Sequence, residues 1–367
     1  MSRFIQLHLL TSYPPSNLNR DEMGRPKTAI MGGEARLRIS SQSLKRAWRT
    51  SEVFENALDG HIGTRTKSKG VEVYEQLLEK GASKKLALDS AKAIADVFGK
   101  LKTLSSAEKK QLKEMDDDKR KKKELSELEI EQLAHISPEE DRAINSLIDE
   151  IINRQTKPEK EDLAVLKKHH TAADIALFGR MLASSPKFNT EAAAQIAHAI
   201  TVHPVVVEDD FFTAVDDLNN GDDDMGAGHM GDTEFSAGLF YLYACIDKQL
   251  LIENLSDDEA LANKTIASLI EAMATVAPTG KQNSFASRAR ASYILCETGN
   301  QQPRSLSVAY LKPVKGENML EDAVKSLNEK LKNMDTAYGA CADKRCSMNA
   351  DMGEGTLQDI IQCATEA

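Results

Sequence analysis

The chain has 367 residues, 41% of them hydrophobic, which is enough to bury the core of one large domain or of two domains. Its formal net charge is −10 at pH 7, and the opening MSRFIQLHLLTSYPPS has too short an apolar run for a signal sequence or a membrane span. Five cysteines without a CxxC pair predict neither a disulfide framework nor a zinc site, so we expect reduced thiols in a cytoplasmic protein.

The chain begins with a predicted strand and a long loop. Residues 3–10 alternate as a half-buried strand does, with Ile5, Leu7 and Leu9 facing inward and polar residues on the other face. Residues 11–27 are rich in Pro, Asn and Gly, which oppose regular structure. Loops of this length usually carry function, so we expect this one to do so.

A strand-to-helix turn at residues 36–49, RLRISSQSLKRAWR, gathers four arginines and one lysine in an acidic protein. The pattern predicts a strand over 36–39, a capping serine at Ser40 and a helix from Ser41. At about 100° per residue, this helix would have one apolar and one basic face. The apolar face would carry Leu44, Ala47 and Trp48, and the basic face would carry Gln42, Lys45, Arg46 and Arg49.

The basic face of this helix has more than one interpretation. Cations near a helix N-terminus oppose the helix dipole unless a negative group lies opposite them. That group could be a carboxylate of the same protein or a phosphate, because helix N-termini and hydroxyl groups bind phosphates well. The other interpretation is a basic surface that faces only water.

The charges are unevenly distributed along the chain. Residues 1–50 contain nine Lys or Arg against three Asp or Glu, and residues 276–315 contain six Lys or Arg against Glu297 alone. Residues 203–234 contain ten acidic residues and no Lys or Arg. Because salt screens charges beyond about 8 Å, local sign decides where a polyanion binds, and the two basic segments can form one groove.

The rest of the chain alternates helical and strand-like patterns. Residues 67–170 are rich in Ala, Leu, Glu and Lys, and their most charged part, residues 107–133, predicts a solvated helical hairpin or a partly mobile segment. Strands with interspersed helices and one helical insertion predict an α+β fold. The expected later elements are a strand within 173–183, a helix over 190–200, an acidic hairpin, a strand over 235–246, a helix over 256–275, and strands near 292–298 and 305–314.

Seven ordered motifs resemble the CasC family, the backbone subunit of the type I-E CRISPR surveillance complex Cascade. They are LNRD (18–21), RISSQSLKRA (38–47), DIALFGRM (174–181), AHAITVH (197–203), FFTAVDDL (211–218), TEFSAGLFYLYA (233–244) and GKQN (280–283). The last 70 residues match only loosely. The resemblance implies a non-catalytic scaffold without cofactor or metal that polymerises along CRISPR RNA and displaces nucleotides at regular intervals.

The implied fold is an RNA-recognition-motif-like (ferredoxin-like) palm with a large helical "fingers" insertion and a protruding "thumb" β-hairpin. The implied partners are CRISPR RNA, the target DNA strand paired to the guide, other copies of the chain arranged head to tail, and other Cascade subunits, with no membrane. The implied segments are 1–59 as the first part of the palm, 60–180 as the fingers, 181–203 as palm, 204–234 as the thumb, and 235–367 as the second part of the palm with the C-terminal segment.

The resemblance also implies the RNA-binding residues. A guide-holding protein must accept every guide sequence, so it should grip phosphates and sugars rather than base edges. Met181 and Thr213 match positions that wedge against the displaced nucleotide. The full set is Arg20, Lys27, Ser40, Gln42, Lys45, Arg46, Arg49, Arg180, Met181, Ser184, Thr213, Lys281 and Gln282.

Two features of the sequence depart from the CasC family, and a second function competes with the scaffold function. Glu34 and Ala35 stand where the family has basic residues, and the thumb is unusually acidic, so we expect its carboxylates to face a neighbouring subunit. The rival function is a metal-dependent RNA endonuclease that uses Asp21 in the first loop. Aspartate clusters at 209–210, 216–217 and 222–224 could in principle bind Mg²⁺.

Overall fold

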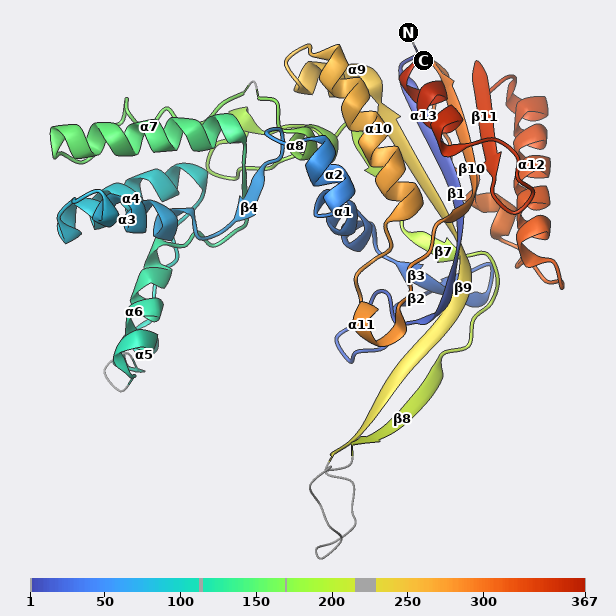
Figure 1. Cartoon of the computed structure of the whole chain (residues 1–367), viewed down its shortest axis with the longest axis horizontal. Helices are drawn as coiled ribbons and strands as arrows, with labels where there is room; N and C mark the ends of the chain where they lie inside the picture. Colours follow the sequence, from blue (N-terminus) through green and yellow to red (C-terminus); the bar gives the residue numbers. More distant parts are fainter. Residues whose placement is uncertain (1, 112–114, 169, 215–228, 367) are drawn as a thin grey trace, which may run out of the picture. The chain divides into compact units, whose positions relative to one another are not determined.

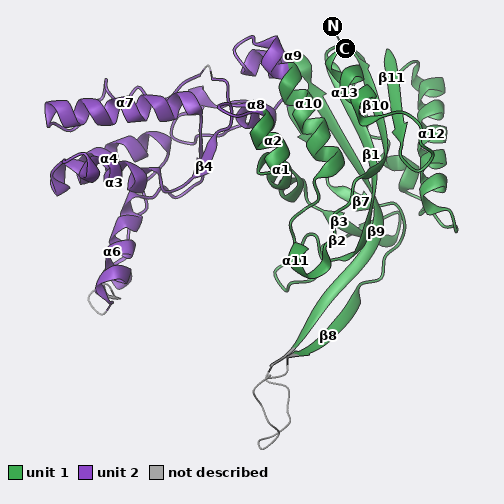
Figure 2. Ribbon diagram, viewed as in Figure 1, with its two compact units in different colours: residues 1–57, 194–249, 263–367 green, residues 58–193, 250–262 purple. Residues whose placement is uncertain are grey.

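The computed structural model describes residues 2–111, 115–168, 170–214 and 229–366. They form two compact units (Figure 2): one contains Met1–Ala57, Ala194–Gln249 and Asn263–Ala367, and the other contains Leu58–Ala193 and Leu250–Ala262. The resemblance implied a helical insertion over residues 60–180, and these bounds stay a prediction. Among the described helices, none combines the length and the apolar character needed to cross a membrane.

The first unit is built on a large antiparallel sheet (Figure 1). Strand β1 (Phe4–Ser16) pairs with β10 (Ala291–Gly299) on one side and with β9 (His229–Asp247) on the other. The order of the main strands is β11-β10-β1-β9-β7-β3-β2, and β6 and β8 also pair with β9. The remaining strands are β2 (Thr28–Met31), β3 (Glu34–Ile39), β6 (Ala194–Ile196), β7 (Ala199–Thr201), β8 (Glu208–Ala214) and β11 (Lys344–Asn349).

Strand β1 is buried on both faces. Ile5 and Leu7 are buried as the alternation predicts, but Gln6 and His8 on the opposite face are buried as well. The strand also continues through Pro14 into the predicted loop, as far as Ser16. A central strand covered on both sides buries its polar face too, so the prediction of a half-buried strand was wrong.

Helices pack against both faces of this sheet. Helix α12 (Met319–Tyr338) buries Ala323 and Leu327 in a cluster with Tyr241 and Tyr293. Helix α13 (Leu357–Thr365) contacts β10 and β11. The other helical segments of this unit are α1 (Ser41–Arg49), α2 (Glu52–Ala57), most of α10 (Glu259–Thr275), α11 (Gln282–Phe285) and the short 3-10 helix η4 (Ser307–Tyr310). Helix α9 (Lys248–Asn254) belongs mostly to the second unit.

A buried ionic network lies beneath helix α12. Glu297 and His8 are fully buried, and the Nε2–H of His8 donates to Glu297 at 3.1 Å. Arg304 makes two hydrogen bonds to the same carboxylate, and Arg345 donates to it at 2.7 Å and also pairs with Asp335. Burial alone would raise the pKa of Glu297, but the hydrogen bonds from His8 and Arg304 outweigh it and lower this pKa to about 2.

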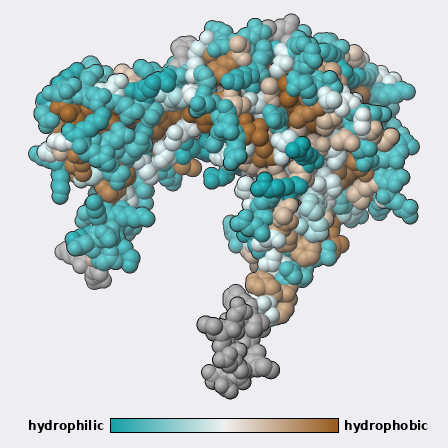
Figure 3. Space-filling model, viewed as in Figure 1, coloured by the Kyte–Doolittle hydropathy of each residue, from teal (hydrophilic) through white to brown (hydrophobic). Residues whose placement is uncertain are grey.

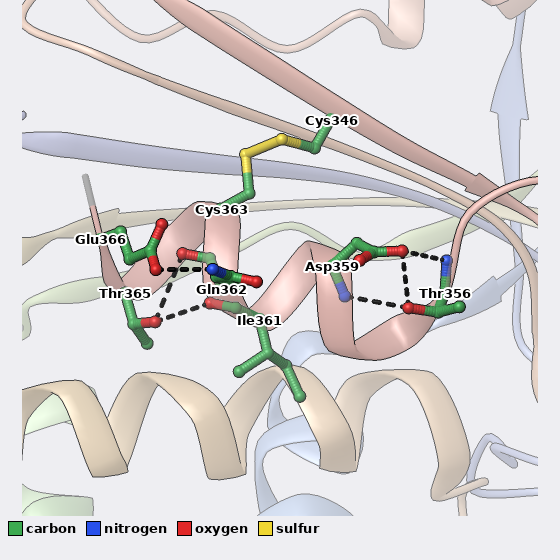
Figure 4. Close-up of a disulfide and its surroundings, with 8 residues drawn as sticks. All are labelled: Cys346, Thr356, Asp359, Ile361, Gln362, Cys363, Thr365 and Glu366. Atoms are coloured by element: carbon green, nitrogen blue, oxygen red, sulfur yellow. Dashed lines mark hydrogen bonds between the residues drawn. A yellow bond between two sulfur atoms is a disulfide. The ribbon is translucent and has the colours of Figure 1, made fainter.

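A disulfide joins Cys346 of β11 to Cys363 of α13 (Figure 4). The expectation of five reduced thiols was therefore wrong for this pair. The two cysteines are 17 positions apart in the sequence, a spacing that matches no known disulfide or metal-binding motif. Their proximity follows from the packing of α13 on β11, which the cysteine count could not predict.

The second unit is mostly helical, as residues 67–170 predict. Its core clusters Val73, Leu77, Ile94, Ile144 and Ile148 from three helices. The elements are α3 (Lys69–Glu79), α4 (Lys84–Phe98), α5 (Ser106–Gln111), α6 (Asp117–Leu125), α7 (Pro138–Arg154), α8 (Ala173–Phe178), the strand pair β4 (Thr64–Thr66) and β5 (Ala134–Ile136), and the 3-10 turns η2 (Ser126–Leu128) and η3 (Pro186–Phe188).

Three predicted elements have the wrong type. The strand expected within 173–183 is helix α8, and the segment 190–200, expected as a helix, contains the two short strands β6 and β7. The strand expected over 305–314 contains the 3-10 helix η4 instead. Short apolar runs fit either type, and pairing with β9 decides the conformation of β6 and β7.

Candidate nucleic-acid interface

Helix α1 has the predicted position, cap and faces. The Oγ of Ser40 accepts a hydrogen bond from the backbone N–H of Ser43 at 3.3 Å. Leu44, Ala47 and Trp48 are all buried. Anchoring of this apolar face turns the opposite face outward, where Gln42 and Arg46 are exposed and Lys45 and Arg49 are half-buried.

The N-terminus of α1 is largely occupied by hydrogen bonds within the protein. The N–H of Ser40 donates to Asn19 Oδ1 at 2.9 Å, and the N–H of Ser41 donates to His198 Nδ1 at 3.3 Å. Three of its four terminal N–H groups, those of Ser40, Ser41 and Ser43, therefore have side-chain acceptors. A phosphate here would be held mainly by side chains. Asn19 and His198 were not among the predicted RNA-binding residues, although both lie within motifs that resemble the CasC family.

The first loop is ordered and presents two further cations. The N–H of Lys27 donates to Asn19 O, and Lys27 O accepts from the N–H of Arg38, both at 2.8 Å, which ties the loop to β3. Arg20 is exposed and Lys27 is half-buried. Within the described residues, the side chains of Arg20, Lys27 and Arg46 have no carboxylate at ion-pair distance. These three cations are therefore available to an external anion.

Two other cations of the turn have roles within the protein. The side chain of Arg36 is fully buried and donates to Thr201 O and Tyr310 O at 3.0 and 3.1 Å, so it does not belong to the basic face. Lys45 is half-buried, and this burial lowers its pKa. An anion that contacted Lys45 would oppose this effect by favouring the charged amine.

A cleft of about 550 Å³ lies between the first loop and the base of the β8–β9 hairpin. Arg25 pairs with Glu234 across it at 2.9 Å, and Lys281 Nζ donates to Thr233 Oγ1 at 2.9 Å. Gln282 accepts from Ser287 at 2.9 Å. Glu234 of the hairpin thus pairs with a cation of the same chain, and Lys281 and Gln282 already have protein partners.

The described part of the hairpin also carries apolar surface. Thr213 and Phe211 are exposed on β8, and Figure 3 shows brown, hydrophobic surface near the end of the hairpin. The acidic clusters at 216–217 and 222–224 lie outside the described residues, so their predicted orientation toward a neighbouring subunit stays a prediction.

The three candidate residues of the second unit have different environments. Met181 is 75% exposed and Ser184 is exposed, so Met181 is not an ordinary core methionine. Arg180 is buried: its guanidinium pairs with Glu140 at 2.6 Å and donates to three backbone carbonyls. The assignment of Arg180 to an RNA phosphate is therefore corrected, because its donors are committed to the protein interior.

Asp21, the candidate nuclease residue, organises its own loop. Its Oδ1 accepts from the N–H groups of Met23 and Arg25, each at 2.9 Å. This is the usual role of an aspartate that begins a turn. Within the part of the chain that the structure describes, no three His, Cys, Asp or Glu side chains are grouped as a metal site requires.

Known proteins match this chain over almost its whole length. A family described as CT1975-like protein matches residues 5–365. A chain from the solved structure "CRISPR RNA-guided surveillance complex, pre-nicking" is 30% identical, with a TM-score of 0.79 over 96% of this chain and 94% of that one. A chain from a "CRISPR RNA-guided surveillance complex" shares the fold at 23% identity, with a TM-score of 0.72 over 99% of both chains.

No curated protein matches the sequence. The family match covers nearly every residue, and the first structural match combines 30% identity with coverage of more than nine-tenths of both chains. The chain therefore belongs to the CT1975-like family, which confirms its resemblance to the CasC backbone subunits.

Proposed function

We propose that the chain is a non-catalytic, RNA-binding backbone subunit of a type I-E CRISPR surveillance complex in the cytoplasm. It grips the phosphates of CRISPR RNA, polymerises along it head to tail with other copies, and presents guide segments for pairing with a target DNA strand. Other Cascade subunits would cap or line this filament. The membership of similar chains in CRISPR RNA-guided surveillance complexes supports the proposal.

One observation carries the proposal: the outward basic face of α1 lies beside a first loop in which Arg20 and Lys27 have no acidic partner among the described residues. Arg20, Lys27 and Arg46 would provide positive charge for the RNA phosphates without contacting base edges. This suits a protein that must accept every guide sequence. The sheet-based unit would be the RNA-recognition-motif-like palm, the helical unit the fingers, and the β8–β9 hairpin the thumb. Exposed Met181 and Thr213 would wedge against the displaced nucleotide.

Salt-dependent binding of single-stranded RNA tests this proposal. Each phosphate contact on a single strand should add about −0.7 to the slope of log K against log salt. Replacing Lys27 and Arg46 by Ala should lower the magnitude of the slope by about 1.4, equally for RNAs of unrelated sequence.

A matched control removes two exposed lysines from α12, Lys325 and Lys332, and so changes the net charge equally. This control should keep the wild-type slope. A slope near zero for the wild type, or equal losses in the two variants, would contradict the proposed phosphate contacts.

A further inference from the structure

An apolar cavity lies beside the N-terminus of α1. It has a volume of about 200 Å³ and is bounded by β7, β9 and η4. Its walls combine aliphatic side chains with three rings and a few hydroxyl groups. The lining residues are Met31, Ala197, His198, Ile200, Thr201, Tyr241, Ser305, Ser307 and Tyr310.

His198 connects this cavity to the basic face. Its Nδ1 lies 3.3 Å from the Ser41 N–H and 3.4 Å from Arg38 Nη1, and both of these groups are donors. Nδ1 is therefore the acceptor, and the neutral ring carries its proton on Nε2. Burial, then the charges of Arg38 and Lys27, lower the pKa of His198, which favours this neutral form.

Arg38 lies next to the cavity, on the neighbouring strand β3. In the antiparallel register Arg38 lies opposite Ile200, and Ile200 lies opposite Tyr241. Residues directly opposite each other project to the same face of a sheet, so Arg38 lies beside Ile200, and its guanidinium also contacts His198; both of these residues line the cavity. The rim is thus cationic while the walls are apolar.

We propose that this cavity binds one nucleobase of the RNA whose phosphates contact the basic face. The inference rests on the proposed function and adds to it a base-binding site. An apolar cavity of about 150 Å³ is large enough to bind benzene, so about 200 Å³ suits a single base ring. The cationic rim favours a nucleotide over an apolar side chain of a protein, because it provides a partner for the adjoining phosphate.

Four of the five hydroxyl groups that line the cavity are already engaged, among them Ser305 Oγ, which accepts from the Ser307 N–H at 3.1 Å. Tyr241 Oη bonds to His8 and accepts from the Leu306 N–H, Tyr310 Oη donates to Ala323 O, and Thr201 Oγ1 donates to His203 O. They have little capacity to read the edge of a base. The cavity would therefore accept bases by shape and stacking, as sequence-tolerant single-strand sites do.

Photo-cross-linking tests the site in the unmodified protein. RNAs that carry one 4-thiouridine at successive positions are irradiated with the full-length chain, and the cross-linked peptides are identified by mass spectrometry. We expect a subset of positions to cross-link to the peptides containing Met31, His198 or Tyr241. Cross-links confined to the first loop and α1, with none on the cavity walls, would overturn the inference.

A cavity-filling variant gives a quantitative test. Ala197→Leu should weaken binding of ordinary RNA about tenfold, whereas Ala197→Ser, which keeps the cavity open, should bind like the wild type. The difference between Ala197→Leu and wild type should disappear on an abasic ribose-phosphate oligomer, because no base can enter the cavity. An equal loss on both RNAs, or no loss on ordinary RNA, would overturn the inference.

The two proposals fail in distinguishable ways. Wild-type protein that binds RNA with the expected salt slope, but shows no cavity cross-link, would refute only the base site. Protein that binds RNA without a salt slope would refute the phosphate-gripping function. If Ala197→Leu does not fold, as judged by circular dichroism, the cross-linking result on the wild type decides.

Discussion

Glu297→Gln should destabilise the sheet-based unit. The substitution keeps the shape of the side chain but removes the charge that Arg304 and Arg345 share. A pKa of 4.5 in the unfolded chain and about 2 in the folded chain correspond to about 3 kcal/mol of stability at neutral pH, at about 1.4 kcal/mol per pH unit between them. Breaking a buried ion pair has a cost of similar size, about 3–5 kcal/mol.

The stabilisation by Glu297 should decrease as the pH falls. Because folding lowers the pKa of Glu297, its stabilising contribution is complete above pH 4.5 and is lost as the pH falls toward 2. The stability difference between wild type and Glu297→Gln should therefore narrow by about 2 kcal/mol between pH 7 and pH 3. Increasing acidity would destabilise the wild type more than the variant.

Urea denaturation followed by tryptophan fluorescence measures this difference. Trp48 is the one tryptophan of the sequence and is buried in the same unit as Glu297. Glu329→Gln on the exposed side of α12 is the matched control and should change stability little. Equal stability of wild type and Glu297→Gln at pH 7, or a difference that does not vary with pH, would refute the reasoning.

Three further predictions concern the disulfide, a buried arginine and the rival function. Cys346→Ser should lower stability by about 3 kcal/mol, and reductant should lower the melting temperature of the wild type but not of this variant. Arg180→Ala, which leaves the buried carboxylate of Glu140 unpaired, should unfold the helical unit at lower urea, as seen by circular dichroism, while Arg180→Lys should be milder. Asp21→Ala should leave labelled RNA intact and unchanged in the presence of Mg²⁺, whereas a cleavage ladder from wild type that this variant abolishes would favour the endonuclease.

The sequence pattern predicted those parts of the interface that depend only on residues close together in the chain. Helix α1, its Ser40 cap and its buried Trp48 all follow from periodicity and capping preference within one short segment. The family resemblance, carried by ordered motifs, is confirmed over almost the whole chain. These features depend on neighbours in sequence, which a sequence contains directly.

Features that depend on distant segments were not predictable in this way. Arg36 and Arg180 look like surface cations, but each is buried because backbone carbonyls far along the chain accept from its guanidinium. The role of His198 depends on the meeting of β7 with α1, and the 346–363 disulfide depends on the packing of α13. Charge counts identify cations, but only the tertiary fold decides which of them face an external ligand.

Native mass spectrometry of the chain coexpressed with CRISPR RNA tests the central claim most directly. A scaffold that polymerises along RNA should give a series of RNA-bound species whose masses differ by one chain of 40.3 kDa, and longer guides should carry more copies. Ribonuclease treatment should collapse this series. Recovery of RNA-free protein alone, or of one copy per RNA whatever its length, would contradict the proposed backbone function.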